Sequence, residues 1–262
     1  MKKKKIITIS LIAVFAVCAV FTGMMAYWQW DDQRQSAQDF DNLAELVADT
    51  TPTREATDAP DAEDPEEPVD DSEAAYLKYE ELYNLNNDFV GWISIEDTAI
   101  DYPVMQTIGS PYFYLKHSFE KAYSDYGVPY VDEACAVGLS TNTVIYGHHM
   151  KNGTMFSSLV NYGSKSYFDE HPVISFDTLY GFGQYQVIAA FAFDTNNETF
   201  RYNEYTDMNE KQFKEFITEC MARRAYDTGY TAEYGDTLLT LSTCEYSHTN
   251  GRFVVVAKLI TD

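Results

Sequence analysis

Eight short apolar segments between residues 89 and 260 constrain the fold of this chain more than any other feature. Each segment is rich in β-branched or aromatic residues and is bounded by Gly, Pro, Asn or Asp, a pattern typical of β-strands separated by turns. The segments are residues 89–95, 100–106, 128–132, 143–147, 173–178, 185–193, 237–243 and 253–260. Many short strands at this spacing predict a closed or sandwiched all-β architecture decorated by a few helices.

Helical patterns interrupt the predicted strands at few places. They fall near residues 112–119, 154–162 and 208–225. In the last of these, four residues recur at helical spacing and should face a core: Phe213, Phe216, Ile217 and Cys220. Another helix should begin at Ser72 as its N-cap and pack on the domain through an apolar stripe. The stripe comprises Tyr76, Tyr79, Leu82 and Tyr83.

The N-terminus predicts a membrane anchor. Lysines at positions 2–5 precede an uncharged run over residues 6–28. At about 1.5 Å per residue, this run is long enough to span a hydrocarbon core of about 30 Å. A cleaved signal peptide is the alternative, but its apolar region is usually shorter and ends at small residues, whereas this run ends in aromatics. The lysines predict a cytoplasmic N-terminus and an extracellular remainder.

An acidic segment follows the predicted anchor. Of the 41 Asp and Glu residues in the chain, 16 lie between residues 31 and 75. With so little apolar surface, the segment should form a largely disordered, extended tether, with a short helix around residues 40–47 as an alternative there. We therefore expect an anchor over residues 1–30, a tether over 31–71 and a folded domain over 72–262. The net charge of −23 argues against nucleic-acid binding, which needs a basic patch.

The four cysteines do not form a disulfide framework. Cys18 lies in the predicted anchor, which leaves an odd number at irregular spacing outside it, without a C-x-x-C motif. Cys135 and Cys220 are interpreted as small buried hydrophobes. Cys244 directly follows the strand-like sequence TLLTLST, residues 237–243, and is a candidate nucleophile.

A reactive thiol needs a base and a donor for the developing oxyanion. A hairpin formed by the last two predicted strands would return Arg252 to the side of Cys244, although the same arginine could be a solvated edge charge. The sequence NTVIYGHHM places His148 directly after a strand and a glycine, and His149 should point elsewhere if the backbone stays extended. The remaining histidines are expected on the surface or in packing: His117, His171 and His248.

A metal site is the alternative interpretation of the tandem histidines. His148 and His149 could bind a metal together with Cys244. Zinc ligands usually come from tighter clusters such as H-E-x-x-H or C-x-x-C, which this sequence lacks. We therefore expect neither a metal nor another cofactor.

Several motifs together resemble class B sortases of Gram-positive bacteria. They are TLSTC followed by Arg252 and VVVAKLI, the segment YGHHMKNGTMFSSL, and GWISI with TAIDYPVMQ near the start of the domain. The resemblance implies an eight-stranded β-barrel with an N-terminal helix and a helical insertion before the last two strands. It also implies a membrane-anchored cysteine transpeptidase that cleaves a C-terminal sorting signal after threonine and forms a thioester acyl-enzyme.

The resemblance assigns roles to individual residues. It implies that Cys244 is the nucleophile, His148 the general acid/base, and Arg252 the oxyanion or substrate-positioning donor. Four further residues match positions that line or adjoin the substrate groove: Ser242, Thr243, Glu245 and Tyr146. Calcium binding, known for some class A enzymes, is not implied.

The resemblance also implies partners. They are secreted proteins that carry a sorting signal, and an amine acceptor on a lipid-linked peptidoglycan precursor. A pilin lysine is the alternative acceptor. A non-catalytic anchored scaffold and a cysteine protease that releases its product to water are the rival functions. We expect a monomer.

Overall fold

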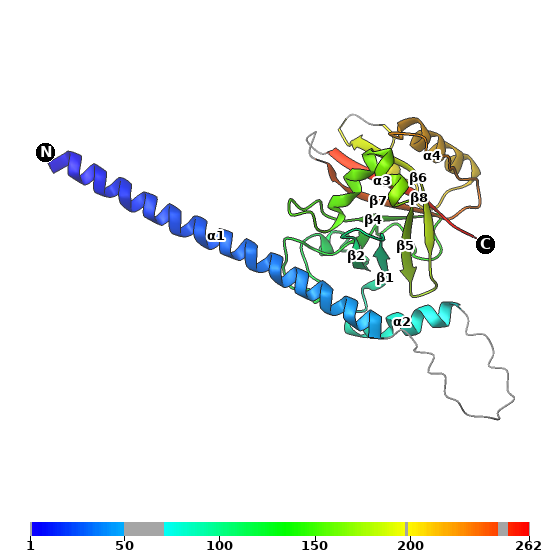
Figure 1. Cartoon of the computed structure of the whole chain (residues 1–262), viewed down its shortest axis with the longest axis horizontal. Helices are drawn as coiled ribbons and strands as arrows, with labels where there is room; N and C mark the ends of the chain where they lie inside the picture. The colour runs from blue at the N-terminus through cyan, green and yellow to red at the C-terminus, as the bar shows by residue number, and fades with distance from the viewer. Residues whose placement is uncertain (1, 50–70, 197–198, 246–250, 262) are drawn as a thin grey trace, which may run out of the picture.

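The computed structural model describes residues 2–49, 71–196, 199–245 and 251–261, and in it the eight strands close into a barrel (Figure 1). Around the barrel the strand order is β1-β2-β3-β4-β7-β8-β6-β5. The pairs β2–β3 and β4–β7 are parallel, and the other neighbours are antiparallel. The strands are β1 (Phe89–Ser94), β2 (Asp101–Met105), β3 (Tyr130–Val131), β4 (Asn142–Tyr146), β5 (Val173–Thr178), β6 (Gln184–Asp194), β7 (Leu238–Glu245) and β8 (Gly251–Leu259).

All eight predicted strands are confirmed, and so is the barrel. The largest difference is β3, which has two residues where the sequence predicted five. Its neighbour Pro129 has no N–H to donate to a ladder, although its carbonyl still accepts from the N–H of Met105 at 3.0 Å. The chain turns again at residues 133–134, directly after this short strand.

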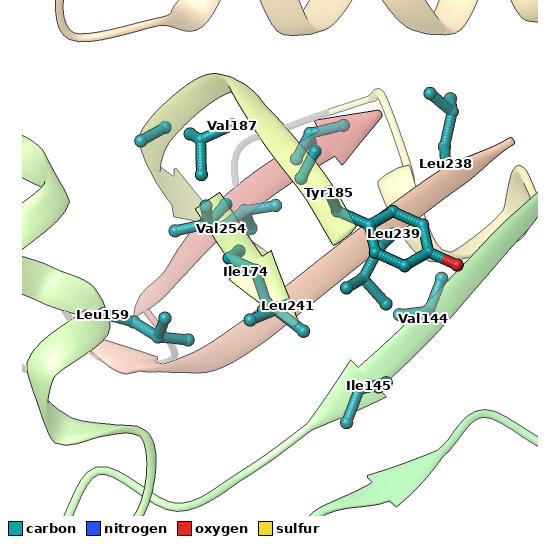
Figure 2. Packing of buried hydrophobic residues seen from close by; sticks show 14 of the residues in the cluster. Val144, Ile145, Leu159, Ile174, Tyr185, Val187, Leu238, Leu239, Leu241 and Val254 are labelled. Carbon is teal, nitrogen blue, oxygen red and sulfur yellow. The ribbon is translucent and has the colours of Figure 1, made fainter. Parts of the chain in front are cut away.

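The main core fills the barrel and extends beneath the outer helices. Residues 253–257 of β8 are all buried, because β8 lies between β6 and β7 and η2 (Phe156–Gly163) packs against it. Figure 2 shows Leu159 of η2 beside Leu241 of β7 and Val254 of β8 in this cluster. Burial on both faces explains why these strands are continuous apolar runs rather than alternating ones.

The predicted helical interruptions are confirmed, and two of them are 3₁₀ helices. The first two are η1 (Phe113–Leu115) and η2, and the third is α4 (Glu210–Arg223), between β6 and β7. A capping box between Asn209 and Gln212 starts α4. As predicted, its buried face comprises Phe213, Phe216, Ile217 and Cys220. The short elements α3 (Lys165–Glu170) and η3 (Tyr202–Glu204) were not predicted.

Helix α2 (Asp71–Leu85) packs on β1 and β5, and it differs from the prediction in two details. It already includes Asp71, so Ser72 lies inside the first turn and is not the N-cap. Its buried stripe is Ala75, Tyr79 and Leu82, whereas Tyr76 is exposed. Tyr76 lies about 100° around the helix from Ala75, which turns it away from the barrel.

Helix α1 (Lys2–Asp49) is longer than the predicted anchor and differs from the expected tether. Figure 1 shows one continuous helix whose C-terminal part lies beside the barrel. The expected disorder does not apply to residues 31–49, where the alternative of a helix around residues 40–47 is confirmed and extended, and residues 50–70 lie outside the described part of the chain. The physical reason is an apolar stripe at i, i+3, i+4 and i+7, which comprises Phe40, Leu43, Ala44 and Val47.

The stripe packs α1 against the barrel. Leu43 is 4% exposed, and the ring of Phe40 meets the ring of Tyr102 edge-on at 4.9 Å between centroids. Further up the helix, the backbone N–H of Asp125 donates to the carboxylate of Asp32 at 3.0 Å. By length and composition, the N-terminal part of α1 could cross a membrane, and its apolar side chains from Leu11 onward are exposed.

Candidate active site

The β7–β8 hairpin places Cys244 and Arg252 together. The two residues are direct cross-strand partners in the antiparallel ladder. Directly opposed residues project from the same face of a sheet with Cβ atoms about 4.5–5.5 Å apart. The expectation that the hairpin returns Arg252 to the side of Cys244 is confirmed. The connecting residues 246–250, which include His248, lie outside the described residues.

The parallel pairing of β4 with β7 brings His148 to the same end of the barrel. The last ladder pair is Tyr146 with Ser242, and the N–H of Gly147 then donates to the carbonyl of Ser242 at 3.1 Å. His148 follows directly, two residues beyond the end of β4, just as Cys244 lies two residues beyond Ser242. Residues almost a hundred positions apart in sequence thus reach one edge of the barrel.

One cavity of about 240 Å³ is lined by Cys244, His148 and Arg252. Tyr146, Ser242 and Thr243 belong to the same lining. The other lining residues come from the loops after β2 and β6 and from neighbouring strands. They are Tyr112, Leu115, Tyr130, Gly147, Phe193, Thr195, Arg201, Tyr202 and Asn203.

Hydrogen bonding fixes the orientation of the His148 ring. Its Nε2 lies 2.7 Å from the carbonyl oxygen of Leu115. Because a carbonyl only accepts, Nε2 carries the proton in the neutral ring and Nδ1 keeps the lone pair. Burial lowers the pKa of His148, and nearby Lys116 lowers it further, against the opposing effects of the Leu115 bond and Asp125. The ring therefore favours the neutral form, which can accept a proton.

The charges of Arg252 and Cys244 affect the pKa values of two buried tyrosines. Burial raises the pKa values of Tyr130 and Tyr202, while Arg252 lowers and Cys244 raises both. Cys244 and Arg252 therefore lie within electrostatic range of the same two phenols, which stay protonated. Among the described residues, the cavity therefore holds two cations, Arg252 across the ladder from the half-buried Cys244 and Arg201 from the loop after β6, and the guanidinium of Arg252 donates to the Gly251 carbonyl at 3.0 Å.

The predicted groove residues are held by bonds within the protein. Ser242 and Thr243 are each 1% exposed; the Ser242 hydroxyl pairs with that of Tyr202 at 2.7 Å, and Thr243 Oγ1 donates to the Gly147 carbonyl at 2.8 Å. The Tyr146 hydroxyl donates to Asp132 at 2.7 Å. The side chain of Glu245 lies outside what the structure describes, so its predicted role stays a prediction.

Two of the remaining thiols, Cys135 and Cys220, are buried, unlike that of Cys244. Cys135 is 4% exposed and Cys220 is fully buried, as predicted. Burial raises the pKa of the Cys135 thiol to about 11 and raises that of Cys220 further. All four cysteines are free thiols. Neutral, buried thiols of this kind are inert.

Three other histidines have structural partners. His117 stacks on Phe113 at 3.9 Å, and His171 Nδ1 lies 3.0 Å from the Glu96 carbonyl, which agrees with the expected packing or surface roles. His149 Nδ1 lies 2.8 Å from the backbone carbonyl of Cys244, a contact that the sequence did not predict. Among the described residues, no three His, Cys, Asp or Glu side chains are grouped to hold a metal ion.

The sequence prediction missed the loop residues of the cavity. Tyr112 fell in the predicted helical segment 112–119 without a role, and Arg201 and Asn203 lie in an irregular and a 3₁₀ segment that neither strand nor helix periodicity predicted. Only the folded positions of these loops show that the three residues line the cavity.

Comparison with known proteins assigns the family. Residues 93–260 match the model of the sortase domain. The chain belongs to the sortase family, class B. It is 35% identical over 187 residues to sortase B of Staphylococcus aureus, a match that covers 70% of this chain and 75% of that protein. Sortase B of Listeria monocytogenes is 31% identical over 210 residues, covering 74% and 84% of the two chains.

Solved structures agree with this assignment. A Staphylococcus aureus sortase B–substrate complex superimposes with a TM-score of 0.72 at 30% identity and covers 88% of this sortase and 98% of that chain. Sortase B of Clostridium perfringens gives a TM-score of 0.62 at 28% identity, with 70% and 99% coverage. This sortase is therefore a cysteine transpeptidase of the class that anchors proteins to the cell wall.

Proposed function

We propose that this sortase cleaves a C-terminal sorting signal after threonine, holds the protein as a thioester on Cys244, and transfers it to an amine of a lipid-linked peptidoglycan precursor. The observation that carries the proposal is that Cys244, His148 and Arg252 line one cavity, with Cys244 and Arg252 paired across a hairpin. A nucleophile, a base and a fixed cation are the parts that acyl transfer requires.

The first half of the reaction breaks the peptide bond. The Cys244 thiol gives its proton to Nδ1 of His148, and the sulfur attacks the threonine carbonyl carbon. The guanidinium of Arg252 stabilises the negative oxygen of the tetrahedral intermediate. As the intermediate collapses, His148 returns the proton to the nitrogen of the leaving peptide, and a thioester remains on Cys244.

The second half forms the new amide bond. The amine of the acceptor loses a proton to His148 and attacks the thioester carbonyl. Arg252 again stabilises the oxyanion, and the collapse expels the Cys244 sulfur, which takes the proton back from His148. Atoms and charges balance without an added cofactor, and water in place of the amine would give hydrolysis.

Substrate recognition is assigned to the cavity residues from the strands and the loop after β6. Tyr146, Ser242 and Thr243 form part of the lining, and Arg201 and Asn203 add polar groups from the loop between β6 and α4. The proposal also keeps Glu245 near the groove, because it directly follows the nucleophile. A polar lining beside a fixed guanidinium suits an extended peptide that presents backbone carbonyls.

We propose that residues 1–30 comprise the cytoplasmic lysines and the membrane anchor, and that the catalytic domain, residues 72–262, lies outside the cell. Support comes from the exposed apolar face of α1 and from the lysines at positions 2–5. Because α1 continues as a helix and already accepts a hydrogen bond from the Asp125 N–H at Asp32, the span and the domain are separated by only about 6 Å along the helix, from residue 28 to residue 32. This keeps the site near membrane-bound substrates and raises their effective concentration.

The test uses the full chain in detergent micelles with a peptide that carries a threonine-containing sorting signal. We expect cleavage after threonine, and an added amine should shift the product from acid to amide. Cleavage that yields only the free acid at saturating amine would contradict transpeptidation and favour a protease. No cleavage of any sorting-signal peptide, with a folded protein, would favour the scaffold.

A further inference from the structure

We propose that His149 is a positioning residue that holds the nucleophile strand in place for the reaction. The inference rests on the proposed function of Cys244. It concerns a residue that does not line the cavity and that the sequence left without a role. His149 follows the catalytic histidine in the chain and reaches the backbone of the catalytic cysteine.

The first observation is that a chain of hydrogen bonds extends the contact between β4 and β7 past the last ladder pair, Tyr146 with Ser242. The N–H of Gly147 donates to the Ser242 carbonyl at 3.1 Å, and Thr243 Oγ1 donates to the Gly147 carbonyl at 2.8 Å. His149 Nδ1 then donates to the Cys244 carbonyl at 2.8 Å. The segment from Gly147 to His149 is thus joined to the segment from Ser242 to Cys244, one bond after another.

The second observation is that Cys244 is held differently on its two sides. On the β8 side it pairs with Arg252 in the ladder. On the β4 side the regular ladder has already ended, and the imidazole of His149 takes the place of a strand neighbour. Because a carbonyl only accepts, the bonding nitrogen of His149 is a donor, so this ring acts as a substitute for a backbone N–H.

The third observation is that His149 itself stands on a rigid loop. The loop is closed by the N–H of Phe156, which donates to the His148 carbonyl at 2.9 Å, and by a bridge between His149 and Met155. Met155 has a positive φ of 56°, and its N–H donates to the hydroxyl of Tyr102 at 3.0 Å. A side chain that starts from a fixed loop can fix the carbonyl that it contacts.

Fixing the Cys244 carbonyl fixes the peptide plane after the nucleophile and therefore the direction of its side chain. The distance between the thiol and the His148 ring then depends on the bond from His149. A misplacement of about 1 Å between reacting groups can cost about 100-fold in rate. Loss of the bond should therefore lower kcat, whereas KM should change little because the cavity lining is intact.

The experiment compares His149→Leu, His149→Asn and His149→Gln in the full chain with a sorting-signal peptide. Asn places an amide donor near the position of Nδ1, Leu offers no donor, and Gln places its donor too far along the side chain. We expect kcat to fall about 10- to 100-fold for Leu and Gln, with KM within about threefold, and Asn to recover most of the rate. His171→Leu is the matched control, because it removes the same kind of imidazole–carbonyl bond far from Cys244 and should leave kcat unchanged.

The outcomes separate this inference from the proposed function. If the wild type cleaves the peptide and His149→Leu has an unchanged kcat, the positioning role is overturned while the proposed function stands. If His149→Leu does not fold, the comparison of Asn with Gln decides: equal rates for the two overturn the inference. If Asn fails to rescue and the pH–rate profile loses a limb, His149 is an acid/base group and the positioning role is wrong. A wild type that cleaves nothing contradicts the proposed function itself.

Discussion

Cys244 and Cys220 are the same side chain in two opposite environments. Cys220 lies on the buried face of α4, where it is fully enclosed and burial raises its pKa. Cys244 lies at the end of β7, half-buried, opposite Arg252 and on the wall of a cavity. Cys220 belongs to an amphipathic helix and follows the polar residues Thr218 and Glu219, whereas Cys244 follows the strand sequence TLLTLST. The two thiols differ in where their elements place them: α4 turns Cys220 into the core, whereas β7 ends one residue after Cys244, at the cavity.

The two regions are also stabilised differently. Around Cys220 the contacts are apolar packing, for example by Phe213 and Phe216. Around Cys244 polar bonds fix the backbone, such as Thr243 to Gly147 and His149 to Cys244. The side chain of Cys244 must stay accessible to substrate, so apolar packing around it cannot hold the end of β7 in place. Hydrogen bonds to the backbone hold it instead.

The largest expected effect comes from removing each thiol in turn. Cys244→Ala should reduce peptide cleavage at least about 10⁴-fold, because Cys244 supplies the only thiol among the described residues that line the cavity. Cys220→Ala should keep its rate and lower only the thermal unfolding midpoint, because it leaves a small hole in the core. Steady-state cleavage and thermal unfolding of both variants provide the measurement. Comparable activity losses in the two variants would break the comparison.

Reactivity toward a thiol reagent provides a sharper version of the same contrast. A water-soluble sulfonate reagent should label Cys244 about 10³-fold faster than Cys135 or Cys220, since the buried thiols react only when the structure opens. Peptide mass mapping of the full chain over time gives each rate separately. Equal, slow labelling at all three positions would argue that Cys244 is as inert as the core thiols and would favour the scaffold.

Arg252 tests whether the partner across the hairpin matters. Arg252→Ala should lower kcat about 10²- to 10³-fold, the usual cost of losing an oxyanion donor. Arg252→Lys should recover part of this loss, because it keeps the charge without the planar fork. Kinetics with the peptide substrate and the labelling rate of Cys244 should be measured together. An Arg252→Ala enzyme with wild-type kcat would remove the guanidinium from the mechanism.

The smallest expected effect is the pH dependence of stability. The pKa of His148 in the folded state lies below its usual value of 6.5, because the ring is buried. Its contribution to stability is therefore present above that value and is lost as the pH falls toward the folded-state pKa. Between about pH 7.5 and about pH 5, the unfolding midpoint of the wild type should fall more than that of His148→Gln, by a few degrees or less. Identical shifts for the two proteins would contradict the lowered pKa.

Much of this molecule could be predicted from sequence, for physical reasons that differ between regions. The eight strands are runs of β-branched and aromatic residues with clear turn residues between them, so local pattern suffices. The pairing of Cys244 with Arg252 followed from a hairpin, which is a local structure as well. His148 joins them only through the parallel pairing of β4 and β7, and its identification came from the resemblance to sortases.

The rest depends on contacts between distant segments. The acidic composition of residues 31–49 predicted disorder, but the stripe that includes Phe40 and Leu43 packs against β2 and its neighbours. His149 reaches the Cys244 carbonyl across almost a hundred residues of sequence, so local pattern alone could not predict this contact. Arg201 and Asn203 reach the cavity from a loop whose path no periodicity encodes.

The most direct test of the central claim is to trap the covalent intermediate. The full chain is mixed with a sorting-signal peptide in the absence of any amine, quenched in acid, and analysed by mass spectrometry before and after proteolysis. The account predicts a mass increase equal to the acyl part that ends in threonine, located on Cys244 and lost on addition of an amine with formation of the amide. An active enzyme that shows no adduct, or one on another residue, would contradict it.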